Sequence, residues 1–366
     1  MGLTPDRIVR PRSERRRRRR PLLKLVGVLI VGAGGLIGWA ATQPPPPDPL
    51  PYYVALPRAG TEADAGISVA PLAAPEAAGT ALAAADPARV DHCTRTRSLG
   101  TRTAVLHPAA HPALVEQGRY GPLPVVASDC REAWQVYARP FDDADPRAQI
   151  AVVLVGLGRS QAETHKALQL PGEVTLAFSP YGESLEEWVR QARAAGHEVL
   201  LEVPMEPSGF PKDDPGPRAL LTSLGPYQNL DRLEWLLARF TGYVGVLERM
   251  GDRFTASQAH LEPLLGELER RGLLYLGRPG GQLLTGDIGV LQASADLDLD
   301  LDPSRAEIAH RLAAAEAHAG RAGAAVVIAR PYPVTLDMLR RWLVELDGKG
   351  LALAPLTAAL ARRARG

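Results

Sequence analysis

Several features that mark common protein classes are scarce in this 366-residue sequence. It has two cysteines, too few for a disulfide-built scaffold, and aromatic residues make up only 5% of it. Basic residues are not in surplus over most of the chain. Residues 1–24 have a net charge of +8 and the whole chain has +1, so residues 25–366 have −7. The main part of the chain therefore lacks the basic excess typical of nucleic-acid binding, and the 46% of hydrophobic residues exclude a wholly disordered chain.

The chain begins with a run of arginines followed by an apolar segment. Arg15–Arg20 ends a basic segment, predicted to be cytoplasmic, over 1–20, and Leu25–Ala41 is a run of 17 uncharged, mostly apolar residues. This length is at the short end for a helix that crosses a membrane, and preceding arginines predict a cytoplasmic N-terminus. We therefore expect a single-pass helix over 21–42 in the bacterial inner membrane, with the main domain in the periplasm. A cleaved signal peptide is the alternative, because Ala40-Ala41-Thr42 resembles a small-residue cleavage site.

Two segments separate this helix from the main domain, which we place at 147–366. Residues 43–90 are rich in proline and alanine with little periodicity, which predicts a disordered linker. Residues 91–146 are expected to form an ordered lead-in that packs on the main domain. An oxidising compartment would permit a disulfide between Cys93 and Cys130, and the sequence leaves open whether the two are joined.

From residue 147 onward, short apolar runs typical of buried strands alternate with helical patterns. Such alternation predicts parallel strands joined by right-handed crossovers. With seven or eight such units we expect the sheet to curl into a barrel, in which chemistry belongs at the C-terminal ends of the strands. The predicted strands are 150–155, 173–178, 198–203, 243–246, 273–276, 324–329 and 351–354. A first helix is predicted between the first two strands, ending at 168, and further helices are predicted over 184–195, 231–240, 256–271, 304–319 and 336–346.

Segments at these strand ends resemble the divergent polysaccharide deacetylase family. The most specific is Val203-Pro-Met-Glu-Pro207, and further ones lie in Leu170–Tyr181, Met250–Thr255 and Pro331–Leu339. The resemblance runs from about Ile150 to the C-terminus. It implies an α/β fold, a distorted (β/α) barrel of the polysaccharide deacetylase type. It also implies an exported protein related to metal-dependent enzymes that remove acetyl groups from amino-sugar polymers.

The resemblance implies a divalent metal held by one aspartate and two histidines, with a second aspartate as base. This chain departs from that pattern at every position. Val155-Gly156 stands where the family has Asp-Asp, and Glu202, Arg249 and Arg330 stand where it has histidines. An arginine cannot coordinate a cation and would repel it. We therefore expect no metal cofactor at these positions, although a divalent cation held by other residues stays open.

Carboxylates and arginines are the remaining candidates for chemistry. If Ala295–Asp302 is extended, its four aspartates lie on one face, where like charges repel and need screening. The sequence leaves open a solvated acidic loop, a salt-bridged pocket with Arg249 and Arg330, and a Ca²⁺ or Mg²⁺ site. The candidate catalytic residues are Glu202, Glu206, Asp296 and Asp300, and the candidate substrate-binding residues are Arg249, Asp252, Arg253 and Arg330.

The retained motifs and the replaced ligands favour a glycan-binding protein of the envelope, acting in cell-wall or exopolysaccharide metabolism. Peptidoglycan and exopolysaccharide are the expected partners, with sugar-stacking faces offered by Trp188, Trp235, Tyr181 and Tyr243. One alternative is an active hydrolase that removes acetyl groups through a rearranged carboxylate site. Another is an envelope scaffold that presents its domain to a protein partner. Whether the chain is an enzyme stays open at this point.

Overall fold

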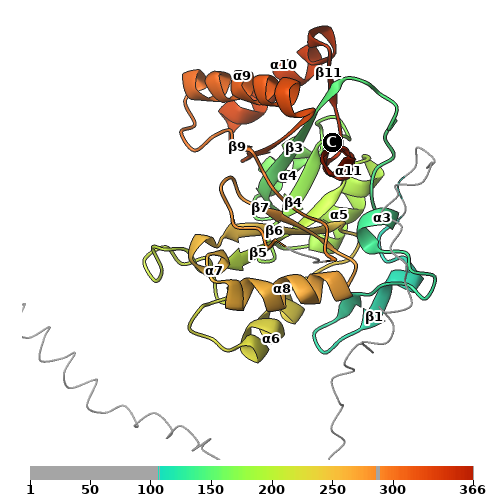
Figure 1. Cartoon of the computed structure of the whole chain (residues 1–366), viewed down its shortest axis with the longest axis vertical. Helices are drawn as coiled ribbons and strands as arrows, with labels where there is room; N and C mark the ends of the chain where they lie inside the picture. Colours follow the sequence, from blue (N-terminus) through green and yellow to red (C-terminus); the bar gives the residue numbers. More distant parts are fainter. Residues whose placement is uncertain (1–105, 107, 286–288, 366) are drawn as a thin grey trace, which may run out of the picture. The chain divides into compact units, whose positions relative to one another are not determined.

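The computed structural model describes residues 106, 108–285 and 289–365, all within one compact unit, 77–366 (Figure 1). The predicted segments 1–20, 21–42 and 43–90 lie outside the described residues and stay predictions. In the described part of the chain, no helix is both long enough and apolar enough to cross a membrane.

The main domain is a curled parallel sheet with helices around it, consistent with a distorted (β/α) barrel (Figure 1). The strands pair in the order β8-β7-β6-β5-β4-β3-β10-β9, and β11 also pairs with β3. All neighbours in this sheet are parallel, as predicted, and parallel neighbours need long crossover connections. The strands are β3 (Ala148–Leu157), β4 (Thr175–Phe178), β5 (Val199–Met205), β6 (Gly245–Met250), β7 (Leu274–Gly277), β8 (Gln292–Ser294), β9 (Leu297–Asp298), β10 (Ala324–Ala329) and β11 (Leu351–Leu353).

The curl of the sheet depends on the short segment between β8 and β9, which stand at its two ends. β8 pairs with β7, and β9 pairs with β10. Between them, the amide of Ala295 donates to the carbonyl of Gly277 in β7, and the amide of Asp296 donates to that of Val326 in β10. These two consecutive residues thus hydrogen-bond to β7 and β10, which lie near opposite edges of the sheet. Their bonds bring the two edges toward each other.

Helices cover the outside of the sheet, and several of its strands are buried along their whole length. Every residue of β4, β5 and β10 is buried, as expected for parallel strands covered on both faces. Local sequence sets several helix ends: the hydroxyl of Ser304 accepts from the Glu307 amide, and Gly323 ends the same helix at φ 78°. The helices are α4 (Gln161–Ala167), α5 (Leu185–Ala194), α6 (Pro226–Leu237), α7 (Asp252–Thr255), α8 (Gln258–Arg270), α9 (Arg305–Ala322), α10 (Pro333–Glu345) and α11 (Leu356–Arg365), with the 3₁₀ turn η2 (Asp347–Lys349).

The lead-in is described from residue 106. It contains the 3₁₀ turn η1 (Pro112–Leu114), the antiparallel strands β1 (Val115–Gln117) and β2 (Pro122–Pro124), and the short helix α3 (Ala133–Val136). Trp134 and Tyr137 are buried and belong to the same hydrophobic core as the sheet. Cys130 is disulfide-bonded, and the only other cysteine of the chain, Cys93, lies outside the described residues.

Candidate functional site

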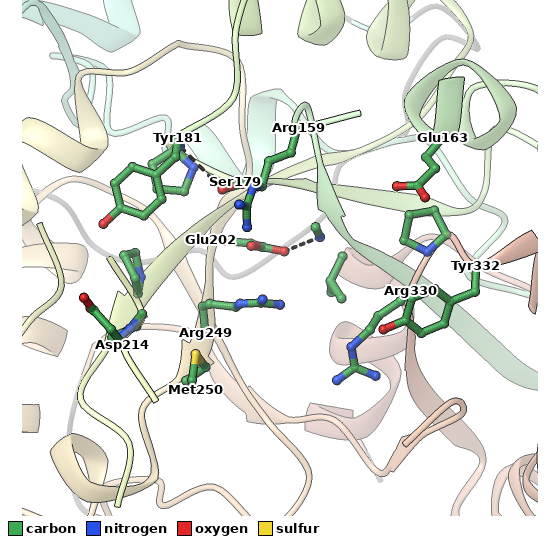
Figure 2. A pocket seen from close by; sticks show the side chains of 16 residues that line it. Arg159, Glu163, Ser179, Tyr181, Glu202, Asp214, Arg249, Met250, Arg330 and Tyr332 are labelled. Atoms are coloured by element: carbon green, nitrogen blue, oxygen red, sulfur yellow. Dashed lines mark hydrogen bonds between the residues drawn. The ribbon is translucent and has the colours of Figure 1, made fainter. Parts of the chain in front are cut away.

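A pocket of about 360 Å³ lies at the C-terminal ends of β3, β4, β5, β6 and β10 (Figure 2). The structure brings together there the positions at which the family resemblance places metal and base residues. Those positions are Val155, Gly156, Glu202, Arg249 and Arg330.

Glu202 is a buried carboxylate in this pocket. Its residue is only 2% exposed, and its Oε1 accepts a hydrogen bond from the backbone amide of Gly156. Gly156 has φ +80°, a backbone conformation that residues with a side chain rarely adopt, so glycine suits this position near the end of β3. Burial raises the pKa of Glu202, against the opposing effects of Arg249, the Gly156 amide, Arg159 and Arg330.

Arg159 and Arg249 approach Glu202 from two sides of the pocket (Figure 2). Arg159 follows the end of β3 and is exposed, whereas Arg249 lies in β6 and is half-buried. Among the residues that the structure describes, none forms a hydrogen bond or an ion pair with either guanidinium. The pocket therefore presents two positive groups whose donors are unused within the described chain.

Arg330 differs, because its charge is balanced by two buried aspartates. Its Nη1 donates to Asp300 Oδ1 at 2.8 Å and to Asp298 Oδ1 at 3.0 Å, and its backbone amide donates to Asp300 Oδ2 at 2.8 Å. The hydroxyl of Thr335 donates to the same Asp300 Oδ2 at 2.9 Å, and Arg278 donates to Asp298. Burial raises the pKa of Asp300. The predicted catalytic Asp300 is thus a structural partner of Arg330.

The other predicted catalytic aspartate, Asp296, lies elsewhere. Its Oδ2 accepts from the Val326 amide at 2.7 Å and pairs with Arg363, and its Oδ1 is 3.4 Å from His318 Nε2. Asp302 is exposed. The segment is not extended throughout, because the strand covers only Leu297–Asp298 and the following residues turn, so the four aspartates do not share one face. The structure contains a salt-bridged arrangement for Asp298 and Asp300, and its arginines are Arg330 and Arg278, not Arg249.

Glu206 and Arg253 hold a loop and do not line this pocket. The buried carboxylate of Glu206 accepts from the Thr222 hydroxyl at 2.7 Å and pairs with Arg253 Nη1 at 3.3 Å. Because Thr222 lies 16 residues further along the chain, these contacts close the connection that leaves β5.

Asp252 accepts from the hydroxyl and the amide of Ser208, and the hydroxyl contact lowers the pKa of Asp252. It lines a separate pocket of about 420 Å³, together with the buried Glu248 and Arg278. Of the eight predicted site residues, Glu202, Arg249 and Arg330 therefore line the 360 Å³ pocket.

Sequence reasoning missed several polar and aromatic residues of the pocket. Most follow directly after a predicted strand, and that position is the signal that could have identified them: Arg159 after β3, Ser179 after β4 and Tyr332 after β10. Glu163 is in α4, whereas Asp214 is in the connection after β5.

Two of the four predicted stacking residues lie along a groove. Tyr181 lines the 360 Å³ pocket and an adjoining pocket of about 520 Å³, which is also lined by Trp188. The two pockets share Arg159 as well, so they adjoin each other, and we refer to them together as the groove. Trp235 lies under the guanidiniums of Arg218 and Arg239, and Tyr243 is buried in the core.

The residues present do not fit the divalent metal that the family resemblance implies. The carboxylates lining the pocket are Glu163, Glu202 and Asp214, and they stand among three arginines. Glu202 Oε1 is taken by the Gly156 amide, and no histidine is among the lining residues. Over the described ranges as a whole, no three His, Cys, Asp or Glu side chains are placed to hold a metal ion.

Comparison with known proteins agrees with the strand-end motifs. The chain is 25% identical over 205 residues to an uncharacterized protein of Haemophilus influenzae, covering 55% of this chain and 72% of that protein. It is 24% identical over 208 residues to the uncharacterized protein YibQ of Escherichia coli, covering 54% of this chain and 63% of YibQ. The crystal structure of the uncharacterized protein ATU2773 from Agrobacterium tumefaciens C58 matches with a TM-score of 0.62 and 37% identity. That match covers 65% of this chain and 99% of ATU2773.

The model of the family described as divergent polysaccharide deacetylase matches residues 152–360, which is more than half of the chain and runs from within β3 to within α11. The chain therefore belongs to the divergent polysaccharide deacetylase family.

Proposed function

We propose that this protein binds a carbohydrate polymer of the bacterial envelope in the groove, without metal-dependent removal of acetyl groups. One observation carries the proposal: the positions where the resemblance places a metal and its base meet in a single pocket, but they bring arginines and a buried carboxylate. Membership of a polysaccharide deacetylase family supports a carbohydrate as the ligand.

The groove has the composition of a sugar site. Tyr181 and Tyr332 line the pocket on opposite sides (Figure 2), where aromatic faces pack against the apolar face of a sugar ring. Ser179, Glu163 and Asp214 provide polar groups for hydroxyls. The adjoining 520 Å³ pocket extends the site beyond a single sugar unit, which favours a polymer over a monosaccharide.

The predicted carboxylates give little support to a rearranged hydrolase. Asp300 is bound by Arg330 and Thr335, Glu206 is bound by Thr222 and Arg253, and Asp296 lies away from the pocket. Among the predicted catalytic residues, Glu202 is left in the pocket, where burial raises its pKa. No other carboxylate of the predicted catalytic set lines the pocket beside it, so the set offers no acid–base pair there.

We place the binding domain in the periplasm, held by one helix over 21–42 in the inner membrane. The support for this location is the arginine run before the apolar segment. The glycans within reach there are peptidoglycan and exported exopolysaccharide. An envelope protein partner remains compatible with this arrangement.

A titration of the purified full chain against peptidoglycan and exopolysaccharide fragments tests the proposal. We expect at least one fragment to bind, and Tyr332→Ala to weaken that binding about tenfold, the scale of a lost aromatic contact of about 1.4 kcal/mol. Tyr227→Ala is the matched control, because Tyr227 is 89% exposed and does not line the groove. Binding of no fragment would contradict the proposal. So would acetate release from a fragment that Glu202→Gln abolishes.

A further inference from the structure

We propose that the pocket recognises an acidic sugar, whose carboxylate or phosphate oxygens accept hydrogen bonds from the guanidiniums of Arg159 and Arg249. The inference rests on the proposed function and names the chemical class of its ligand. It goes beyond family membership, because neither arginine is a metal ligand or a base.

The first argument is the unused hydrogen-bonding capacity of the pair. A guanidinium carries five N–H donors and keeps its charge at any physiological pH. Arg330 donates hydrogen bonds to Asp298 and Asp300, but no described residue accepts a hydrogen bond from the guanidinium of Arg159 or Arg249. Arg249 is half-buried, so its charge is partly removed from water without an ion pair. An oxyanion in the pocket would restore both hydrogen bonds and charge balance.

The second argument is that both arginines start from well-fixed backbone. Arg249 lies in β6, where it pairs with Pro204 of β5. Arg159 lies in a turn that Thr164 braces: its hydroxyl accepts from the Gly158 amide at 3.0 Å and donates to the Ser160 carbonyl at 2.7 Å. Fixed starting points reduce the entropy that binding must overcome.

The third argument concerns the other charges that face the pair. Glu202 lies between the two arginines, and it offsets at most one of their two charges, and less where it is protonated (Figure 2). Glu163 and Asp214 stand on the two sides of the pocket, with the arginine pair between them, and the Asp214 carboxylate already accepts from the Gly216 amide at 2.8 Å. Arg159, Arg249 and Glu202 taken together are therefore net positive, whereas Glu163 and Asp214 at the margins are suited to hydroxyl groups.

Oligosaccharides matched in everything but charge provide the test. The full chain is titrated calorimetrically with oligogalacturonate, oligomannuronate and a glucuronate-containing oligosaccharide, each beside its methyl ester, and with a phosphorylated oligosaccharide beside its unphosphorylated parent. We expect an acidic form to bind at least tenfold more tightly than its neutral match, and to weaken as salt is raised. The pair that responds identifies carboxylate or phosphate as the source of the anion.

Variants then locate the charge recognition. Arg159→Gln changes an exposed side chain that has no hydrogen-bond or ion-pair partner among the described residues, so we expect folding to stay intact. We expect it and Arg249→Gln each to lower affinity for the acidic form about tenfold or more. The same variants should lower affinity for the neutral form by a smaller factor than for the acidic form. Arg321→Gln, on the exposed face of α9, is the control and should change neither. Equal binding of acidic and neutral forms, insensitive to both arginine variants, would overturn the inference and leave glycan binding in place. Binding of no oligosaccharide, acidic or neutral, would overturn the proposed function itself.

Discussion

Arg330 binds Asp300 through two separate groups, its guanidinium Nη1 and its own backbone amide, each at 2.8 Å. The aspartate is wholly buried, so the pair fixes the end of β10 to the turn after β9 and removes the positive charge of Arg330 from the pocket. Arg330, which stands where the resemblance implies a histidine, is thus held in the structure by an ion pair. Arg159 and Arg249 keep their charges available.

Asp300→Ala should destabilise the protein by about 3 kcal/mol or more, because it leaves Arg330 with half of its ion pairs and the Thr335 hydroxyl without its acceptor. Urea unfolding of both proteins measures this difference. Asp302→Ala is the control, since Asp302 is exposed, and it should change the free energy of unfolding by no more than about 0.5 kcal/mol. Equal effects of the two substitutions would show that the buried pair contributes little.

Glu202→Gln should remove a loss of stability that the wild-type protein undergoes as pH rises. Burial raises the pKa of Glu202 in the folded protein above the usual glutamate value of 4.5, so the folded state holds a proton that the unfolded state has released. Wild-type stability therefore falls as pH rises from about 4.5 through the folded-state pKa, and the variant does not share that loss. We expect the stability of Glu202→Gln relative to wild type to increase from pH 4 to pH 8. Glu183→Gln provides the same change at an exposed site. A Glu202→Gln difference that stays flat with pH would contradict the account.

Gly182→Ala should destabilise the protein and weaken ligand binding. A Cβ at Gly182 would lie 2.7 Å from the carbonyl oxygen of Gly158, so the loops after β3 and β4 would have to separate next to Arg159. We expect a cost of about 1–3 kcal/mol. Gly320→Ala is the matched control, because a Cβ there meets nothing within 4 Å, and alanine in the exposed face of α9 should add about 1 kcal/mol of stability. Thermal unfolding should therefore show a lower Tm for Gly182→Ala and a higher Tm for Gly320→Ala than for the wild-type protein.

The parallel α/β sheet was predictable because its buried strands are short apolar runs in the sequence. The run Ala324–Ala329 was predicted with the bounds that β10 has. Helix α6 was predicted too late, since its start is set by Pro226 at the first helical position rather than by apolar periodicity. The strands β8 and β9 are too short for any periodicity to show, and they were missed.

The site was only partly predictable, for a different reason. The family motifs located Glu202, Arg249 and Arg330, because strand ends converge by topology. Spacing could not show that Asp300 pairs with Arg330 or that Glu206 accepts a hydrogen bond from Thr222, since those contacts join residues 30 and 16 positions apart. Nor could it show that Asp296 bonds to the Val326 amide and to Arg363, since these residues lie 30 and 67 positions further along the chain.

Glycan binding after metal removal tests the central claim most directly. The full chain is treated with EDTA, dialysed and titrated calorimetrically with the acidic oligosaccharide panel, with Arg249→Gln in parallel. The account predicts that an acidic oligosaccharide binds the chelated protein as tightly as the untreated one, and that Arg249→Gln weakens this binding. Binding that disappears with EDTA and returns with Zn²⁺ would contradict it, as would the absence of binding to any member of the panel.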